Sequence, residues 1–294
     1  MPILLSLLPL LAQVSSGGII SGGSEIPIGK ARMPARRGEV SAPTPPQPLP
    51  PPIQPCQTLI DTDLNEAIER ASDWVARAKD ADFAEAQGCL GMAHARKADF
   101  EDAEKAFLAA RDATGADHAK RANWGAMAGN AALAGGQPAR ALMALALAHD
   151  DAVDVGDKAA LGEIAFDKAR ALVALYRAIE ARVALNEAAA AIPENSDVWL
   201  LSATLYRRTA KLEIAQQHIE KAAALSPLDP AVGLEAGVIA MLAGREDAAR
   251  KSWKSVVATS PQSAEAAQAK AYLAQIGEGT TQPNPAPPVK PESR

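Results

Sequence analysis

Residues 196–229 read SDVWLLSATLYRRTAKLEIAQQHIEKAAALSPLD, and this stretch decides the fold. Apolar residues recur in it at spacings of three and four, first as Trp199, Ala203 and Tyr206 and then as Ala215, Ile219 and Ala222. Each set lies on one face of a helix, because residues at these spacings are neighbours on the helix surface. Pro227 ends the second helix, since a proline inside a helix removes a backbone hydrogen bond and clashes with the preceding turn. The stretch therefore predicts two antiparallel helices that approach closely at small residues.

The same plan recurs along the chain at a nearly fixed period. Pro193, Pro227 and Pro261 follow one another at intervals of 34 residues. A period of this size is typical of proteins built from stacked repeats. The chain aligned on these prolines predicts five units, at about residues 84–117, 122–155, 162–195, 196–229 and 230–263. The first two units lack the final proline and are followed by extra residues, which predict longer loops or helix extensions.

The pattern resembles the tetratricopeptide repeat, in which a W-x2-L-G-x2-Y helix is followed by an A-x3-F helix and a proline. One departure is Ser202, which stands where the repeat prefers leucine. The resemblance covers about residues 60–276. It implies an all-α fold, a right-handed α-solenoid of about five helix-turn-helix repeats with capping helices at both ends.

Extra helices are expected at the two ends of the repeats, because the ends of a solenoid need polar caps. Residues 62–80 predict an amphipathic helix whose apolar face consists of Leu64, Ala67, Ile68, Ala71, Trp74 and Val75. This helix is either a cap or the second half of a degenerate sixth repeat. Residues 263–277 predict a last helix with Ala267, Ala271 and Ala274 facing inward and Gly277 ending it. We therefore expect the solenoid to span residues 58–278.

The first residues have the pattern of an export signal. An apolar run of ten residues, from Ile3 to Ala12, precedes small and polar residues. The run has the length of the apolar part of a signal peptide and is too short to cross a bilayer as a helix. No Lys or Arg precedes Lys30, so only the amino terminus supplies the usual positive charge. We expect residues 1–17 to be a signal peptide and the chain to be exported to the periplasm. A cytoplasmic chain and an N-terminally membrane-anchored chain are the alternatives.

Most prolines lie outside the helical body. Of the 22 prolines, eight lie between Pro43 and Pro55 and five between Pro283 and Pro291. We expect residues 18–57 to be a disordered linker rich in Gly, Ser and Pro, and residues 279–294 to be a disordered tail. The two cysteines, Cys56 and Cys89, allow two interpretations. Either they pair in an exported chain and attach the linker to the body, or Cys89 is a small buried apolar residue on a helix.

No motif in the sequence predicts catalysis. HExxH, GxSxG and CxxC are absent, and the four histidines are scattered. We therefore expect a non-enzymatic protein with no catalytic residue, no metal site and no cofactor. The formal net charge of −5 argues against nucleic acid as a partner, because such partners need a basic surface. The 66 alanines and only 11 aromatic residues instead favour closely packed helices.

The resemblance implies an interaction scaffold that binds a peptide or protein segment in a concave groove. The inner positions expected to contact the partner are Asn130, Arg170, Arg207, Arg208, Leu234, Val238 and Met241. Met92 and Arg96 hold corresponding positions in the first repeat. A groove that is basic in its middle and apolar at its end would prefer acidic residues beside apolar anchors. Alternatives are a self-associating structural organiser and an accessory subunit of an envelope assembly or enzyme complex.

Overall fold

The computed structural model describes residues 54–277 of the 294-residue chain. The expected signal peptide, the expected tail and the expected linker up to residue 53 lie outside the described residues. Within residues 54–277 the chain forms thirteen α-helices and no strand. In chain order the helices are α1 (Gln54–Thr62), α2 (Leu64–Val75), α3 (Asp80–Lys97), α4 (Phe100–Ala113), α5 (His118–Ala134), α6 (Pro138–Val155), α7 (Lys158–Ala174), α8 (Ala178–Ala191), α9 (Ser196–Arg208), α10 (Leu212–Leu225), α11 (Pro230–Leu242), α12 (Glu246–Thr259) and α13 (Ala264–Ile276). No described helix combines the length and the hydropathy that crossing a bilayer requires.

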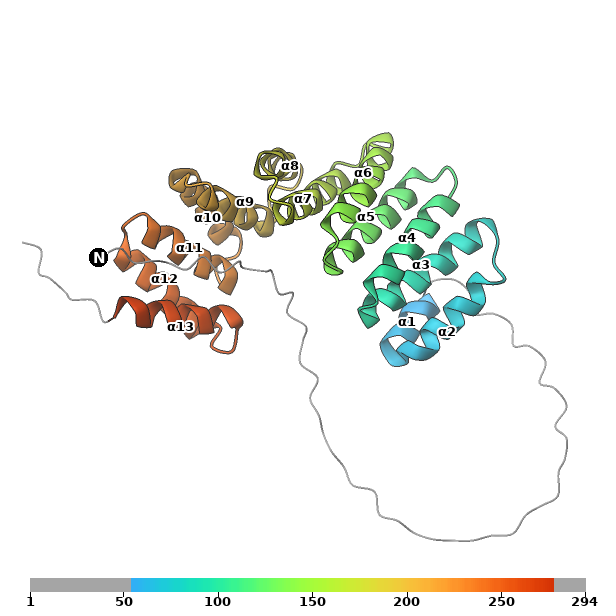
Figure 1. The fold of residues 1–294 in the computed structure, drawn as a ribbon, viewed down its shortest axis with the longest axis horizontal. Helices are drawn as coiled ribbons and strands as arrows, with labels where there is room; N and C mark the ends of the chain where they lie inside the picture. The colour runs from blue at the N-terminus through green and yellow to red at the C-terminus, as the bar shows by residue number, and fades with distance from the viewer. Residues whose placement is uncertain (1–53, 278–294) are drawn as a thin grey trace, which may run out of the picture. The chain divides into compact units, whose positions relative to one another are not determined.

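The helices pack as antiparallel pairs that follow one another in chain order, and α13 comes last (Figure 1). Each even-numbered helix contacts the odd-numbered helix before it and the odd-numbered helix after it. Odd-numbered helices also contact the next odd-numbered helix, as α5 does α7 and α9 does α11, with the exception of α3 and α5, which are not in comparable contact. The row of pairs is therefore tighter on the side of the odd-numbered helices, which are the first helices of the pairs.

One contact recurs in every pair from α3–α4 to α11–α12. A small residue on the first helix faces a large apolar residue sixteen positions later on the second helix, in the pairs Gly91–Phe107, Gly129–Leu145, Ala169–Leu185, Ala203–Ile219 and Gly237–Trp253. A Cβ atom added to Gly91, Gly129 or Gly237 would lie 2.7, 2.5 or 2.1 Å from the facing side chain. These glycines therefore let the two helices approach to a distance that no side chain would permit.

The long intervals after the first two units are taken up by helix extensions. Helices α5, α6 and α7 have 17, 18 and 17 residues, whereas α9 and α10 have 13 and 14. The extra residues 117–121 and 150–160 fall mostly within these longer helices. Of the two expected explanations, extended helices rather than long loops therefore apply.

The N-terminal end of the helical body differs from the expectation. Helix α1 begins at Gln54, inside the segment expected to be a linker up to residue 57. It contacts α2 and α3, and a disulfide between Cys56 and Cys89 joins it to α3. Helix α2 buries the expected face through Ala67 and Ala71. Because α1 precedes it as a first helix, α2 is the second half of a sixth pair rather than a lone cap.

The expected inner face of the last helix is wrong. Ala267, Ala271 and Ala274 are exposed, and α13 instead buries Ala266 and Ala269. The half-buried residues Tyr272, Leu273 and Ile276 pack on the same cluster, which includes Trp253 of α12. Alanines lie on several faces of this helix, so their spacing alone does not mark the buried one. The large apolar residues decide the face because they bury more area.

Ser202 is an adapted residue rather than a defect of the repeat. It is buried, and its Oγ atom lies 2.7 Å from Nδ1 of His218, with which it shares a hydrogen bond. The rings of Trp199 and Tyr206 meet the His218 ring edge-on, with centroids 5.3 and 5.2 Å away. Burial lowers the pKa of His218, which favours the neutral ring in this apolar setting. A leucine at position 202 would leave the polar ring of His218 without this hydrogen-bond partner.

We expect Gly129→Ala to destabilise the fold although alanine is normally the better helix former by about 1 kcal/mol. The added Cβ would lie 2.5 Å from Cγ of Leu145, and overpacking of this kind costs about 1–3 kcal/mol. Denaturant unfolding measures the change. In a Leu145→Ala background the same substitution should become neutral or stabilising, because the facing side chain is gone. If Gly129→Ala destabilises both backgrounds equally, the contact with Leu145 is not the cause of the destabilisation.

Candidate functional site

An open groove of about 490 Å³ lies between α1, α3 and α5, over two residues of α4. Its lining is mainly apolar and consists of Gln57, Ile60, Asp61, Met92, Ala95, Arg96, Phe100, Phe107, Met127, Asn130, Ala131 and Ala134. The volume falls in the range of about 300–1,000 Å³ that is usual for ligand sites. The groove belongs to the side of the first helices, where the row of pairs is tighter.

The helices α3 and α5 line the groove in the same way. Met92 and Arg96 lie one turn apart on α3, and Met127 and Asn130 lie one turn apart on α5. Residues at these spacings share a helix face, so each helix presents a methionine followed by a polar side chain. Both methionines are half-buried, and Arg96 and Asn130 are exposed. The result is an apolar floor with polar groups at the rim.

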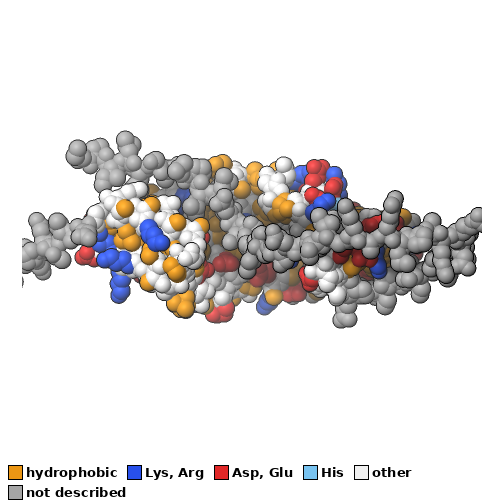
Figure 2. Space-filling model, turned by 90° about the horizontal axis from the view of Figure 1, so that it is seen from below, with side chains coloured by type: hydrophobic (Ala, Val, Ile, Leu, Met, Phe, Trp, Pro, Cys, Tyr) orange, Lys and Arg blue, Asp and Glu red, His pale blue; other side chains and the backbone are white. Residues whose placement is uncertain are grey.

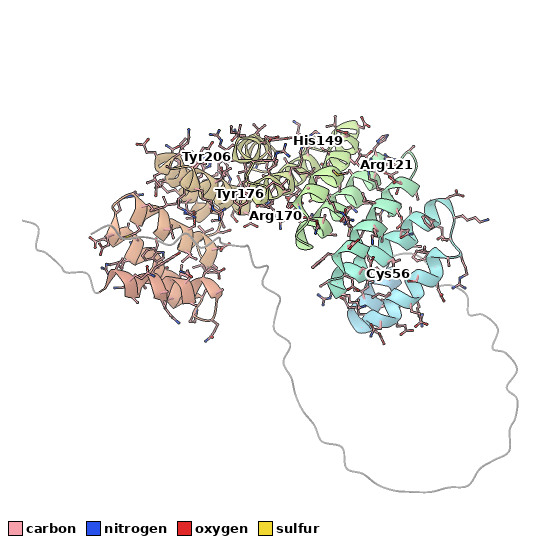
Figure 3. The ribbon with its side chains drawn as sticks, viewed as in Figure 1. Cys56, Arg121, His149, Arg170, Tyr176 and Tyr206 are labelled. Atoms are coloured by element: carbon pink, nitrogen blue, oxygen red, sulfur yellow. A yellow bond between two sulfur atoms is a disulfide. The ribbon has the colours of Figure 1, made fainter. Side chains whose placement is uncertain are left out.

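The disulfide holds α1 in place as one wall of the groove. Cys56 in the first turn of α1 is bonded to Cys89 in the middle of α3, with 6.0 Å between their Cα atoms (Figure 3). Ile60, one turn after Cys56, is buried in the same cluster as both cysteines. Gln57 and Asp61 follow on the same helix and reach the groove. Of the two interpretations of the cysteines, the disulfide is the one that the structure contains.

Two charges at the rim have no partner in the described part of the chain. Asp61 and Arg96 are both exposed, and neither forms an ion pair or a hydrogen bond with residues 54–277. Both charges therefore remain open to a ligand. Together they offer one charge of each sign.

Asn130 and Arg170 of the predicted set lie together, but a carboxylate joins them. The Asn130 Nδ2 atom donates a hydrogen bond to Asp167 at 2.7 Å. Arg170 donates to Asp167 at 2.9 Å and to the Asn130 Oδ1 atom at 3.3 Å (Figure 3). Asp167 is itself buried. This network links α5 to α7 and neutralises the positive charge of Arg170.

The adjacent arginines of α9 have different surroundings. The Arg207 Nε atom donates a hydrogen bond to Glu235 of α11 at 2.5 Å, and the two side chains are only 13% and 9% exposed. Arg208 is exposed and forms no ion pair within residues 54–277. Two of the three predicted arginines therefore have carboxylate partners in their own chain. The expected basic middle of the groove is largely neutralised, and the argument for an acidic ligand loses its basis.

The predicted apolar end of the groove is partly covered. Leu234, Val238 and Met241 are half-buried and pack on the cluster shared by α12 and α13. Of the seven predicted residues, Asn130 alone lines the groove between α1, α3 and α5. The structure therefore does not bring the seven residues into one site.

Other buried charges also join successive pairs. Asp151 of α6 accepts hydrogen bonds from Arg111 of α4 at 2.9 Å and from Arg121 of α5 at 2.8 Å. Burial alone would raise the pKa of Asp151, but the hydrogen bonds from Arg121 and Arg111 outweigh it and hold the pKa below its usual value. Glu104 is buried likewise and accepts from Arg140 at 3.0 Å. These groups are paired with permanent cations, which suits packing rather than proton transfer. Among the described residues, no three His, Cys, Asp or Glu side chains are grouped so as to hold a metal ion.

Several groove residues were not anticipated from the sequence, namely Gln57, Ile60, Asp61, Phe100 and Met127. The first three lie on α1, a helix that the sequence did not predict and that begins inside the expected linker. The one signal for them was the cysteine pair, because a bond from Cys56 to Cys89 places residues 57–61 beside residues 90–96. Met92 and Arg96, by contrast, occupy inner positions that the repeat pattern predicted, and both line the groove.

Comparison with known proteins identifies the fold. No protein-family model matches the chain, and no curated protein matches it in sequence. Among solved structures, BtubC from P. vanneervenii superimposes with a TM-score of 0.57 at 16% identity over 81% of this chain and 99% of that one. PilF from Pseudomonas aeruginosa gives 0.59 at 14% identity over 75% and 95%. PilW, described as a type IV pilus biogenesis factor, gives 0.60 at 16% identity over 73% and 94%. At these identities the matches show the fold, which is an all-α solenoid of tetratricopeptide-type repeats.

We expect the two adjacent arginines of α9 to differ sharply in their effect on stability. Arg207→Ala leaves Glu235 as a buried, unpaired carboxylate and should lower the free energy of unfolding by about 3–5 kcal/mol. Arg208→Ala is the matched control and should change it by less than about 0.5 kcal/mol. Denaturant unfolding of both variants tests this. If Arg207→Ala is as harmless as its neighbour, the ion pair does not exist in solution.

Proposed function

We propose that this chain is a non-enzymatic interaction scaffold that binds a peptide or protein segment in the groove between α1, α3 and α5. The observation that carries the proposal is the apolar floor of Met92 and Met127 beside the unpaired charges of Asp61 and Arg96. Binding sites typically combine an apolar surface with a few placed polar groups. Methionine suits this purpose because its flexible side chain adapts to differently shaped apolar partners.

The groove favours a segment with an apolar anchor flanked by charges of both signs. Arg96 suits a carboxylate, which a guanidinium binds through two parallel hydrogen bonds. Asp61 on the opposite wall suits a Lys or Arg of the ligand. Asn130 contributes less than expected, because both of its amide atoms already have partners in Asp167 and Arg170. The ligand differs in this respect from the acidic segment that the sequence alone predicted.

The proposed place of action is the bacterial cell envelope. The apolar run from Ile3 to Ala12 has the length of a signal-peptide core. The disulfide between Cys56 and Cys89 supports the same location, because disulfides persist in oxidising compartments and are rare in the cytosol. Two features far apart in the chain thus point to export.

Peptides selected by phage display on the full-length chain test the groove. Met127→Ala and Arg96→Glu should each weaken a selected peptide by about tenfold, or 1.4 kcal/mol, as measured by fluorescence anisotropy. Leu228→Ala and Arg208→Glu are controls, because both residues are exposed and lie outside the groove. These controls should bind as tightly as the parent chain.

Thermal melts of the four variants check that the fold is intact. If a peptide binds the groove variants and the controls equally well, its binding site lies elsewhere on the surface. That result would refute the groove as the site.

The chain isolated from its native cell should lack its first 12 to 17 residues and carry no free thiol. Mass spectrometry gives the first residue, and maleimide labelling of the unfolded chain before and after reduction counts the thiols. We expect labelling of Cys56 and Cys89 only after reduction. A chain that begins at Met1 and labels at once would place the protein in a reducing compartment.

A further inference from the structure

The turn inside each helix pair from α3–α4 to α11–α12 contains one residue in the left-handed backbone region. These residues are Ala98, Gly136, Tyr176, Ala210 and Gly244, with φ angles of 67, 69, 60, 57 and 73°. Glycine adopts this conformation without strain, whereas the Cβ of another residue crowds the following carbonyl oxygen. Tyr176 is the one large side chain among the five. Its backbone therefore carries a strain that the glycines at equivalent turns avoid.

The side chain of Tyr176 gains nothing from its own chain in return. It is 89% exposed and forms no hydrogen bond or ring contact within residues 54–277 (Figure 3). A strained and exposed aromatic residue is unusual in a stable fold, because strain persists where another interaction outweighs it. Tyrosine is also among the residues that most often dominate the energy of protein interfaces.

Four further apolar residues are exposed on α6 and α8. Ile179 and Val183 lie on α8 and Met143 and Leu147 on α6, with exposed fractions of 72, 65, 71 and 41%. The two helices are neighbours, since His149 of α6 lies 3.2 Å from Glu187 of α8. We call these five residues the α6–α8 patch. On the face in Figure 2, the visible hydrophobic side chains lie among charged and other residues.

The α6–α8 patch is not a general property of the repeat. Each second helix has a fully buried alanine at the same place, namely Ala103, Ala141, Ala181, Ala215 and Ala249. Two residues after it stand Lys105, Met143, Val183, Gln217 and Lys251 in turn, and two residues before it stand Glu101, Ala139, Ile179, Glu213 and Asp247. The outer face is thus charged or polar in α4, α10 and α12 and apolar only in α6 and α8. Exposed apolar side chains that are concentrated on two neighbouring helices are typical of an interaction site.

The charges around the patch differ between its two ends. Helices α6 and α8 run in the same direction, because each is antiparallel to α7 between them. At the carboxyl-terminal end lie three carboxylates, Asp150, Asp154 and Glu187, and the last ten residues of α6 contain no Lys or Arg. At the amino-terminal end of α8, Arg177 and Arg182 outnumber Glu180. The patch is therefore acidic at one end and basic at the other.

We propose that the α6–α8 patch binds the same patch of a second copy of this chain, with the helices of the two copies antiparallel. A two-fold axis across the helices places the acidic end of each copy against the basic end of the other, so the surface is complementary to itself. Such a contact closes after two copies and forms no chain of copies. Val183 would then be buried near its centre, and Tyr176 would lie against the acidic end of the second copy. The groove between α1, α3 and α5 remains outside the contact, so the two proposals stand independently.

Sedimentation equilibrium of the full-length, oxidised chain tests the proposal, and we expect twice the mass of one chain. Met143→Lys and Val183→Lys install the residue that α4 and α12 carry at this place and should give monomers. Leu228→Lys is the control, because Leu228 is 72% exposed but lies outside the patch, and it should leave the dimer intact.

Tyr176→Gly should weaken the dimer by at least about tenfold, in line with the loss of an aromatic anchor. At a concentration where both proteins are monomeric, the same variant should melt higher than the parent chain, because the strained turn is relieved.

The charge pattern has its own test. Arg182→Glu should weaken the dimer, because Arg177 is already paired with Glu180 and both ends would then carry a net negative charge. A dimer as strong in this variant as in the parent chain would overturn the antiparallel arrangement. A parent chain that stays monomeric at about 100 µM, far above the Kd of about 1 µM of a modest interface, would overturn the proposal as a whole. If that monomer instead binds lipid vesicles through Tyr176, the patch belongs to a membrane rather than to a second copy.

Discussion

A small residue facing a large one, sixteen positions later, sets the distance between the helices of each pair from α3–α4 to α11–α12. The bulkiest partners, Phe107 and Trp253, face glycines, because no Cβ fits between a helix backbone and an aromatic ring at this distance. The 66 alanines serve the same close approach at the remaining contacts. The groove and the hydrogen bonds between successive helix pairs both depend on this close approach, because the positions of their side chains follow from the helix spacing.

Buried charges determine which helix pairs lie next to one another. Asp151 links α6 to α4 through Arg111, and Glu235 links α11 to α9 through Arg207, each through a cation in the preceding pair. Repeats of similar shape can pack on one another in more than one register when only alanines meet. A buried carboxylate permits one register, because any other leaves it without its cation at a cost of several kcal/mol. We infer that these buried ion pairs contribute more to the specificity with which the helix pairs stack than to the stability of the stack.

The repeat pattern predicted the close contacts and the pairing of helices, because both depend on spacing within about 34 residues. It did not predict the inner face of α13, where alanines lie all round the helix and Tyr272 and Leu273 decide instead. The repeat pattern also did not predict that Arg207 is neutralised. Its partner Glu235 belongs to the next helix pair, and the repeat period does not determine which charged side chains contact each other. Helix α1 was missed for a related reason. Its place depends on the bond from Cys56 to Cys89, and two cysteines alone left both the paired and the unpaired state open.

The two surfaces proposed for binding share one helix pair, α5–α6. In the pair α5–α6, Met127 faces the groove and Met143 belongs to the α6–α8 patch. Between them lies the contact of Gly129 with Leu145, two residues further along each helix. A change that moves this contact therefore shifts both surfaces together, whereas a change of either methionine leaves the other surface in place. The chain can thus alter what it binds on one side without altering the other, as long as the sixteen-residue contact is kept.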